Sequence, residues 1–455
     1  MGYKKRSSFG GIAVLVVVVA SLLYVYFSAT FEREVPAIHI ENNGYWNLKK
    51  PLEITIDDAS GIKEYKITLK TQTDIVTLSH EQFMTPQTKI HLEVKAPRTL
   101  YRTKDEFVEI VVEATDFSKW NLLNGNATAK SAKLTLDKRK PQLSIVKNSY
   151  KISKGGSALV IFKVKDENLD ELYILGNNDK HFKPQPFYKE GYYISLLAWP
   201  VKDRTFKATV IAKDKAGNIS KAYVPLYLKH KDYRLSKIKL SDKFLKGKIA
   251  DLAEEFVETE GVDEKLEQFK IINEDVRAKN EKLIHEITSK VADDELLSSF
   301  KVRKMYPLKN AKVVAYFGDH RKYYYDGEFI SEAYHLGLDL ASNAMAEIKP
   351  QNGGEVVYSD YNGLYGNMPI INHGLGLYTL YGHCSSVKVN QGDIVTKGEA
   401  IANTGKSGYA MGDHLHFGVL VQGIEVRPQE WMDKQWIKLN ITDVIKSAKN
   451  IIDRN

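Results

Sequence analysis

The most informative run of residues in this chain is Gly412-Asp413-His414-Leu415-His416-Phe417-Gly418-Val419. Its central polar and apolar residues alternate, which is typical of a β-strand. In a strand His414 and His416 project from one face, while Leu415 and Phe417 turn toward a core. The run therefore predicts a strand that presents two imidazoles to one site.

Two patterns upstream carry related chemistry. In Tyr334-His335-Leu336-Gly337-Leu338-Asp339 a histidine and an aspartate stand four residues apart, so on a helix or on one strand face both side chains can reach one ion. The second pattern is Tyr381-Gly382-His383-Cys384, which follows the glycine-rich segment 372–376. Six of the 12 histidines fall between residues 320 and 416, which even spacing would not produce.

These residue types point to a metal site. Neutral imidazole and carboxylate are ligands of catalytic zinc, which takes three protein groups and leaves a position for water. The single cysteine, Cys384, excludes a cysteine-based zinc or iron–sulfur site, and we expect it to be a buried small apolar group. The His-Glu-x-x-His pattern is absent, because His285-Glu286 is followed by Ile287-Thr288-Ser289. Proton transfer would then fall to the histidines that do not bind the metal.

Residues 306–431 resemble the LytM/lysostaphin-type zinc metallopeptidase family (M23). The family's marks are His-x-Gly-x-Asp, Tyr-Gly-His and His-Leu-His-Phe, and all three occur here in that order. The resemblance implies an antiparallel β-sheet groove and a zinc metalloendopeptidase, similar to peptidoglycan DD-endopeptidases, that hydrolyses peptide cross-links during cell-wall remodelling.

Position by position, the resemblance implies that His335, Asp339 and His416 bind one Zn²⁺ per chain. It implies that His383 and His414 are the catalytic histidines of the cleft. The alternative is a non-catalytic M23-like regulator that activates another wall hydrolase, and the five intact positions favour the enzyme. A wall-binding adhesin without activity is a third reading that the intact site disfavours.

Two histidines near these motifs receive plainer interpretations. We expect His373 to satisfy a backbone hydrogen bond near the groove rather than to bind metal. We expect His320 to be a solvated loop residue.

The N-terminus predicts a membrane anchor. Lys4, Lys5 and Arg6 precede the uncharged stretch 7–31, and 25 helical residues span ~37 Å against a hydrocarbon core of ~30 Å. A cleaved signal peptide is the alternative, but the small-x-small site is poorly formed around Ser28-Ala29-Thr30. Residues 1–34 are thus predicted to be a cytoplasmic tip and transmembrane helix. The chain would be a single-pass protein of the inner (cytoplasmic) membrane, with its catalytic part periplasmic or extracytoplasmic.

Between the anchor and the motifs, short alternating segments predict two β-sandwich modules, residues 35–137 and 138–235. The run Val111-Val112-Glu113-Ala114-Thr115-Asp116 recurs 98 residues later as Val210-Ile211-Ala212-Lys213-Asp214, which resembles immunoglobulin-like spacer modules of bacteria. We interpret both as spacers, with wall binding as the alternative. The second module is basic, which suits an anionic polymer or lipid surface or simply a solvated lysine-rich face.

Residues 236–300 predict an acidic helical pair. Leu245, Ile249, Leu252 and Phe256 recur at helical spacing before Gly261 interrupts the pattern. Residues 251–300 hold 15 acidic and 6 basic residues, a net charge of −9. We interpret the pair as a solvated linker; the alternative hypothesis is that its carboxylates cap the open position of the metal.

The remaining boundaries are a peptidase domain at 301–435 and a C-terminal helical tail at 436–455. The predicted fold class is therefore multidomain, with a transmembrane helix, two β-sandwiches, a helical hairpin and an antiparallel β-sheet peptidase domain. The expected partners are peptidoglycan stem peptides and the membrane. No motif interleaves aromatic residues with arginine, which excludes nucleic acid, and no protein partner is indicated.

Overall fold

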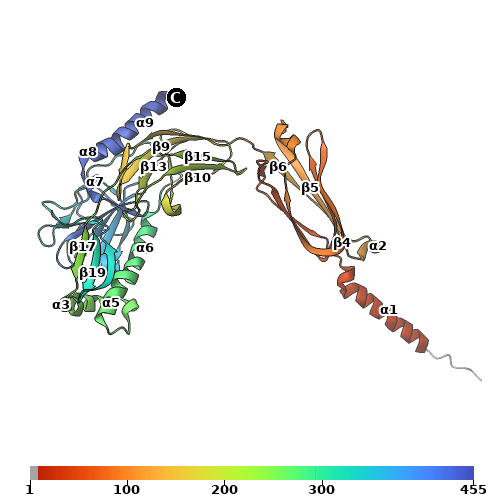
Figure 1. Cartoon of the computed structure of the whole chain (residues 1–455), viewed down its shortest axis with the longest axis horizontal. Coiled ribbons are helices and arrows are strands. Elements are labelled where there is room, and N and C mark those ends of the chain that lie inside the picture. The colour runs from red at the N-terminus through yellow and green to blue at the C-terminus, as the bar shows by residue number, and fades with distance from the viewer. Residues whose placement is uncertain (1–8, 293, 455) are drawn as a thin grey trace, which may run out of the picture. The chain divides into compact units, whose positions relative to one another are not determined.

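The computed structural model describes residues 9–292 and 294–454. Its chain is mostly β-sheet with few helices and divides into two compact units (Figure 1). The first unit consists of the residues up to Lys140 with segments 168–170 and 213–219. The second consists of 141–167, 171–212 and 220 to the C-terminus.

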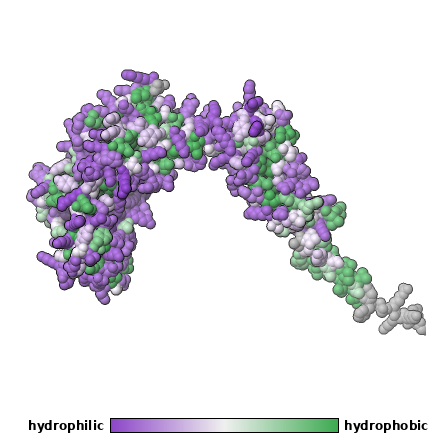
Figure 2. Space-filling model, in the orientation of Figure 1, coloured by the Kyte–Doolittle hydropathy of each residue, from purple (hydrophilic) through white to green (hydrophobic). Residues whose placement is uncertain are grey.

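Helix α1 (Phe9–Phe27) opens the first unit and contains no charged residue. Most of its large apolar side chains are exposed, and Figure 2 shows a largely hydrophobic surface there. Within residues 9–292 and 294–454, no helix meets the length and apolarity required to cross a membrane. The membrane anchor stays a prediction.

The rest of the first unit is a six-stranded sheet in the order β1-β3-β5-β6-β2, with β4 also paired to β3. Its elements are β1 (Ala37–Glu41), β2 (Tyr45–Trp46), β3 (Leu52–Lys70), β4 (Ile75–Val94), β5 (Phe107–Asp116), β6 (Ala127–Leu136) and the short α2 (Trp120–Leu123). In β5 the apolar residues at alternate positions, from Val108 to Ala114, are buried in one core because successive side chains point to opposite faces.

The sequence repeat corresponds to one local structure used twice. The Asp116 carboxylate accepts hydrogen bonds from the backbone N–H groups of Ser118 (3.0 Å) and Asn126 (2.7 Å). Asp214 accepts one from the N–H of Asn218 at 2.8 Å. Both aspartates are fully buried, so these bonds offset the cost of removing a carboxylate from water.

The second unit begins with two four-stranded sheets, in the orders β11-β10-β14-β15 and β12-β13-β9-β7, and a parallel pair β8–β16. Their bounds are β7 (Gln142–Asn148), β8 (Lys151–Ser153), β9 (Ser157–Lys165), β10 (Leu169–Leu175), β11 (His181–Phe182), β12 (Gln185–Pro186), β13 (Tyr192–Ala198), β14 (Thr209–Asp214), β15 (Ile219–Tyr223) and β16 (Tyr227–Lys229).

Strand β9 is buried on both faces, which explains its unbroken apolar run Ala158–Phe162. Part of its cover comes from the C-terminus, where α7 (Pro428–Met432), α8 (Lys434–Ile437) and α9 (Asp443–Arg454) follow one another. Helix α9 packs on β7 and β9 through Val444, Ile445, Ala448 and Ile452 (Figure 1).

The acidic helical segment contains α3 (Asp242–Phe244), α4 (Ala250–Ala253), α5 (Lys265–Ile271) and α6 (Arg277–Thr288), with π-helical turns at Leu245–Ile249 and Ile272–Val276. Its apolar stripe, including Leu252, Phe269 and Ile284, shares one buried core with Tyr378 and Leu380 of the C-terminal sheet. The interpretation of this segment as a solvated linker is therefore wrong. Burying the apolar stripe against the sheet removes it from water and leaves most of the charged side chains exposed, together with a few apolar ones such as Val257 and Leu283.

The C-terminal part is built on an eight-stranded antiparallel sheet, in the order β18-β21-β29-β25-β24-β23-β27 with β30 paired to β29. Two three-stranded sheets, β17-β19-β20 and β22-β28-β26, flank it. The bounds are β17 (Leu235–Lys239), β18 (Lys312–Ala315), β19 (His320–Tyr325), β20 (Glu328–Tyr334), β21 (Leu338–Ala341), β22 (Glu347–Ile348), β23 (Gly354–Tyr361), β24 (Asn367–Asn372), β25 (Leu377–Gly382), β26 (Ser386–Val387), β27 (Ile394–Val395), β28 (Ala402–Asn403), β29 (Leu415–Val421) and β30 (Ile424–Val426).

Within the second unit, buried polar contacts join the two four-stranded sheets formed by β7 and β9–β15 to this C-terminal part. The Gln422 side chain bonds the backbone N–H (2.7 Å) and carbonyl (3.0 Å) of Lys183. The Glu430 carboxylate accepts the N–H of Ser157 at 3.0 Å, and the Trp431 indole donates to the Ser157 hydroxyl at 3.2 Å. These contacts hold the segments 141–167 and 171–212 as part of the unit that carries the motif residues.

Candidate metal and catalytic site

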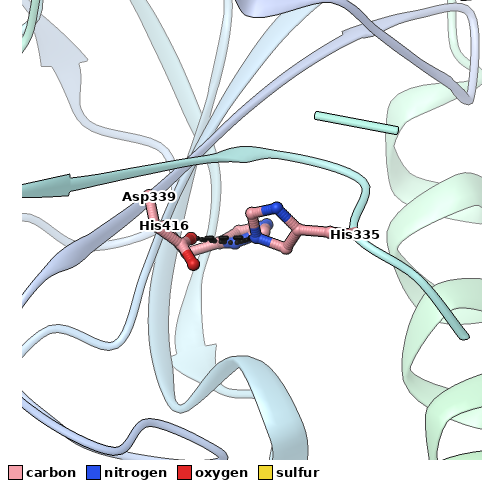
Figure 3. Close-up of side chains that lie close together, drawn as sticks. All are labelled: His335, Asp339 and His416. Carbon is pink, nitrogen blue, oxygen red and sulfur yellow. Dashed lines mark hydrogen bonds and ion pairs between the residues drawn. The ribbon is translucent and has the colours of Figure 1, made fainter. Parts of the chain in front are cut away.

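Three side chains from the predicted motifs converge on one buried point (Figure 3). Asp339 on β21 lies directly opposite His416 on the adjacent strand β29, and His335 lies in the loop that enters β21. His335 Nε2 is 3.0 Å from Asp339 Oδ1 and 3.2 Å from His416 Nδ1, and His416 Nδ1 is 2.9 Å from Asp339 Oδ1. The structure thus brings the predicted ligand residues together.

The orientation of His335 fits metal binding. Its Nδ1 lies 2.9 Å from the backbone carbonyl oxygen of Tyr316. Because a carbonyl only accepts, Nδ1 donates to Tyr316, and this bond directs the other ring nitrogen, Nε2, toward Asp339 and His416. Two imidazole nitrogens and one carboxylate oxygen within 4.8 Å of one another form a donor set that catalytic zinc uses.

The charges of these groups also fit a cation. Burial raises the pKa of the Asp339 carboxyl, but the charge and hydrogen bond of His335 and the bond from His416 outweigh burial and hold this pKa well below its usual value. Burial lowers the pKa of His416, against the opposing effect of Asp339. The carboxylate is therefore ionised and the His416 imidazole neutral near pH 7, the protonation states that bind a metal ion.

Glycine 337 makes this convergence sterically possible. A Cβ atom at this position would lie 2.5 Å from Cε1 of His416 and 3.0 Å from the carbonyl oxygen of Phe417. The glycine in His335-Leu336-Gly337-Leu338-Asp339 therefore makes room for the imidazole of His416.

His383 and His414 lie beside the three converging residues. His383 follows β25 with a φ of 66°, in the left-handed region that non-glycine residues seldom adopt. Its Nδ1 donates to the carbonyl oxygen of Ser407 at 2.8 Å, so its Nε2 is unprotonated. Burial, followed by the charges of His416 and His414, lowers the pKa of His383 to about 3.

His414 precedes β29, and Leu415 separates it from His416 as the strand alternation predicts. The rings of His383 and His414 lie 4.8 Å apart between centroids. His414 Nε2 is 3.7 Å from Asp339 Oδ2. The five predicted residues therefore share one site, with two imidazoles more than a three-ligand metal needs.

These side chains line a cavity of about 250 Å³. The further lining residues that the sequence interpretation missed include Arg277, Arg321, Tyr365 and Tyr409. For Tyr365 a signal existed in its neighbours Gly363 and Gly366, which both have positive φ and form the turn that places the ring.

The hypothesis that acidic helical residues cap the metal is not supported. Among the described residues, the only lining residue from 236–300 is the basic Arg277.

Three other residues discussed in the sequence analysis, His373, Cys384 and His320, do not line the cavity. His373 bonds the carbonyl oxygen of Gly353 (2.8 Å) and the hydroxyl of Thr379 (2.7 Å), which confirms its expected structural role. Cys384 is fully buried, as predicted. His320 was wrongly placed in a loop: it lies on β19 and stacks on the Tyr334 ring at 4.4 Å.

Comparison with known proteins identifies the region around this cavity. Residues 333–428 match peptidase family M23. The DD-carboxypeptidase/endopeptidase Mpg of Neisseria meningitidis is 34% identical over 94 residues, which are 21% of this chain and 22% of that protein. The peptidoglycan DD-endopeptidase ShyB of Vibrio cholerae is 31% identical over 119 residues, 26% of this chain and 27% of that protein.

A third relative is named as an activator of a hydrolase rather than as an endopeptidase. The murein hydrolase activator EnvC of Escherichia coli is 33% identical over 98 residues, which are 22% of this chain and 23% of that protein. In each of these three comparisons the match spans less than a third of the relative's length.

Proposed function

Residues 333–428 of this chain form a domain of peptidase family M23, and on that premise we propose that the protein is a zinc-dependent endopeptidase that hydrolyses peptide cross-links of peptidoglycan. The observation that carries the proposal is the convergence of His335, Asp339 and His416 beside two further imidazoles. Relatives named as DD-endopeptidases support the substrate class.

In this proposal His335, Asp339 and His416 hold one zinc ion per chain. When bound, zinc would supply Lewis-acid polarisation of the scissile carbonyl and would acidify an attacking water. His383 and His414 orient that water and transfer its proton to the leaving amine. The hydrogen bond from His383 Nδ1 to Ser407 fixes the ring with its unprotonated Nε2 available for these tasks.

The second candidate function is activation of another wall hydrolase without catalysis, which the name of EnvC favours. It predicts a protein that retains no zinc and cuts nothing alone. The intact donor set in this chain favours the enzyme.

We also propose that residues 1–34 anchor the protein in the inner membrane, with the remainder periplasmic or extracytoplasmic. The cations Lys4, Lys5 and Arg6 before the uncharged stretch 7–31 support this orientation. The modules at 35–137 and 138–235 are proposed to be immunoglobulin-like, with the first as a spacer. Membrane fractionation of the full chain, compared with a chain lacking residues 1–34, tests the anchor.

The activity is tested by mass spectrometry of purified cross-linked wall fragments after incubation with the zinc-loaded full chain. We expect cross-linked fragments to be converted to uncross-linked ones, whose masses identify the bond. The matched control is His383→Ala at equal zinc content, which should leave the fragments uncut. Intact fragments with folded, zinc-loaded wild-type protein would overturn the enzyme proposal, and stimulation of a separate hydrolase would then support the activator.

A further inference from the structure

The active-site cavity contains two guanidinium groups that the proposed chemistry does not use. Arg277 begins α6, and Arg321 lies on β19. Both line the cavity of about 250 Å³ that contains the His335, Asp339 and His416 cluster. A group bound in this cavity beside the cluster is therefore bordered by both arginines.

The helical segment holds Arg277 in a fixed position. Arg277 Nε donates to the carbonyl oxygen of Asn273 at 3.1 Å, and Nη2 donates to Asn273 Oδ1 at 3.0 Å. Asn273 is itself buried and donates to the hydroxyl of Ser331 on β20 at 2.9 Å. These bonds use two of the five N–H donors of the guanidinium and orient the remainder.

Arg277 also lacks a close counter-charge. Among the described residues, no carboxylate oxygen is recorded within 4.0 Å of its nitrogens, although Glu281 stands one helical turn further on. Arg321 is paired with Asp319 at 3.4 Å, and Asp319 also accepts the hydroxyl of Ser236 at 2.7 Å. Arg277 therefore places at the cavity wall a positive charge that takes part in no ion pair among the described residues, while Arg321 adds a second guanidinium that is already paired.

Both guanidiniums act on the same part of this wall. The Arg277 Cζ lies 5.9 Å from the ring centroid of Tyr409. Burial raises the pKa of the Tyr409 hydroxyl, and the charges of Arg277 and Arg321 both act to lower that pKa. A planar guanidinium matches a carboxylate with paired N–H donors, which is the strongest common hydrogen-bond arrangement for that anion.

We propose that Arg277 and Arg321 form a subsite for a free substrate carboxylate on the carbon attached to the scissile nitrogen. The inference rests on the proposed function and specifies its substrate class: peptides with an acid on the amine side of the cleaved bond. A D-alanine–diaminopimelate cross-link carries such a carboxylate, and so does a C-terminal D-alanyl-D-alanine. The corresponding amides do not.

The test compares N-acetyl-D-alanyl-D-alanine with its C-terminal amide. Equilibrium binding is measured by calorimetry on the metal-free full chain, so that neither cleavage nor a metal ion contributes. We expect the acid to bind about 10-fold or more tightly than the amide, since hydrogen bonds to charged groups are worth this much. Arg277→Met and Arg321→Met should each remove at least about half of the difference in binding free energy between the acid and the amide.

The controls separate charge from folding. Arg303→Met removes an exposed arginine outside the cavity lining and should keep the full preference. Arg277→Lys keeps the charge without the planar fork and should retain part of the preference. Thermal unfolding of every variant identifies any that fail to fold, and the two arginines on different elements give two independent variants.

Three results would overturn the inference: equal binding of acid and amide to the wild-type chain, no measurable binding of the acid, or a preference unchanged in both Arg277→Met and Arg321→Met. The proposed function is judged separately by cleavage of wall fragments with zinc-loaded protein. An acid preference that depends on the arginines, in a chain that cuts nothing, would retain the subsite and reject the enzyme.

Discussion

Replacing Gly337 by alanine should displace a proposed zinc ligand without removing it. The new Cβ would lie 2.5 Å from Cε1 of the His416 ring. Ordinary van der Waals contact begins at 3.4 Å. The imidazole must therefore move by at least 0.9 Å, the difference between these distances. Metal–ligand distances tolerate only about 0.2 Å.

The ring has little freedom to move elsewhere, because His416 is only 6% exposed. We therefore expect Gly337→Ala to weaken zinc binding by about 10- to 100-fold, the range seen when residues that orient ligands are changed. This corresponds to about 1.4–2.7 kcal/mol. The backbone itself should accept alanine, since Gly337 is not among the described glycines with positive φ.

The measurement is zinc affinity by competition with a chelating dye, with zinc content determined by elemental analysis. Gly412→Ala is the matched control, because its new Cβ would have no neighbour within 4 Å although the residue lies two positions before His414. Wild-type zinc affinity in a folded Gly337→Ala protein would refute the reasoning, as would equal loss of zinc in Gly412→Ala.

Three further predictions concern different groups. His416→Ala and Asp339→Ala should abolish zinc retention, whereas His383→Ala and His414→Ala should keep near-stoichiometric zinc and lose turnover; equal zinc loss in His414→Ala and His416→Ala by elemental analysis would contradict these roles. Glu430→Leu should have a free energy of unfolding in urea about 1–3 kcal/mol lower than Glu430→Gln. Leucine leaves the buried N–H of Ser157 without an acceptor, whereas the glutamine side-chain oxygen can accept this hydrogen bond. Equal stabilities of the two variants would show that this bond contributes nothing. Burial lowers the pKa of His285, but its 2.8 Å hydrogen bond to Glu425 and the charge of that residue outweigh burial and raise the pKa overall. The stabilisation from His285 is then complete below its unfolded pKa of about 6.5 and is lost as the pH rises through the higher folded pKa. Above pH ~6.5 the Tm should therefore fall more steeply in the wild type than in His285→Gln. Parallel Tm profiles of the two proteins would contradict this prediction.

That the five motif residues lie together was predictable from their resemblance to the M23 motifs, and part of the pattern is local. His414 and His416 share a face in any strand, and His335 and Asp339 share one at a separation of four residues. The sequence also marked Asp116 and Asp214 as equivalent, since the same short run surrounds each. The sequence did not indicate that His320 lies on β19, because a histidine within the charged run Asp319-His320-Arg321-Lys322 has no alternation of polar and apolar residues that would predict a strand.

The sequence by itself determined the residue types of the site, their local spacing and the face of each helix that must be buried. Only the tertiary structure decided which surfaces meet. Helical periodicity marks Phe269 and Ile284 as buried but does not specify their partner, since a sheet and another helix satisfy an apolar stripe equally well. Arg277 stands on the polar side of that pattern, so its place in the cavity wall depends on how α6 packs against the sheet. Such contacts join residues far apart in the chain and arise from the shape of the whole core rather than from any local run.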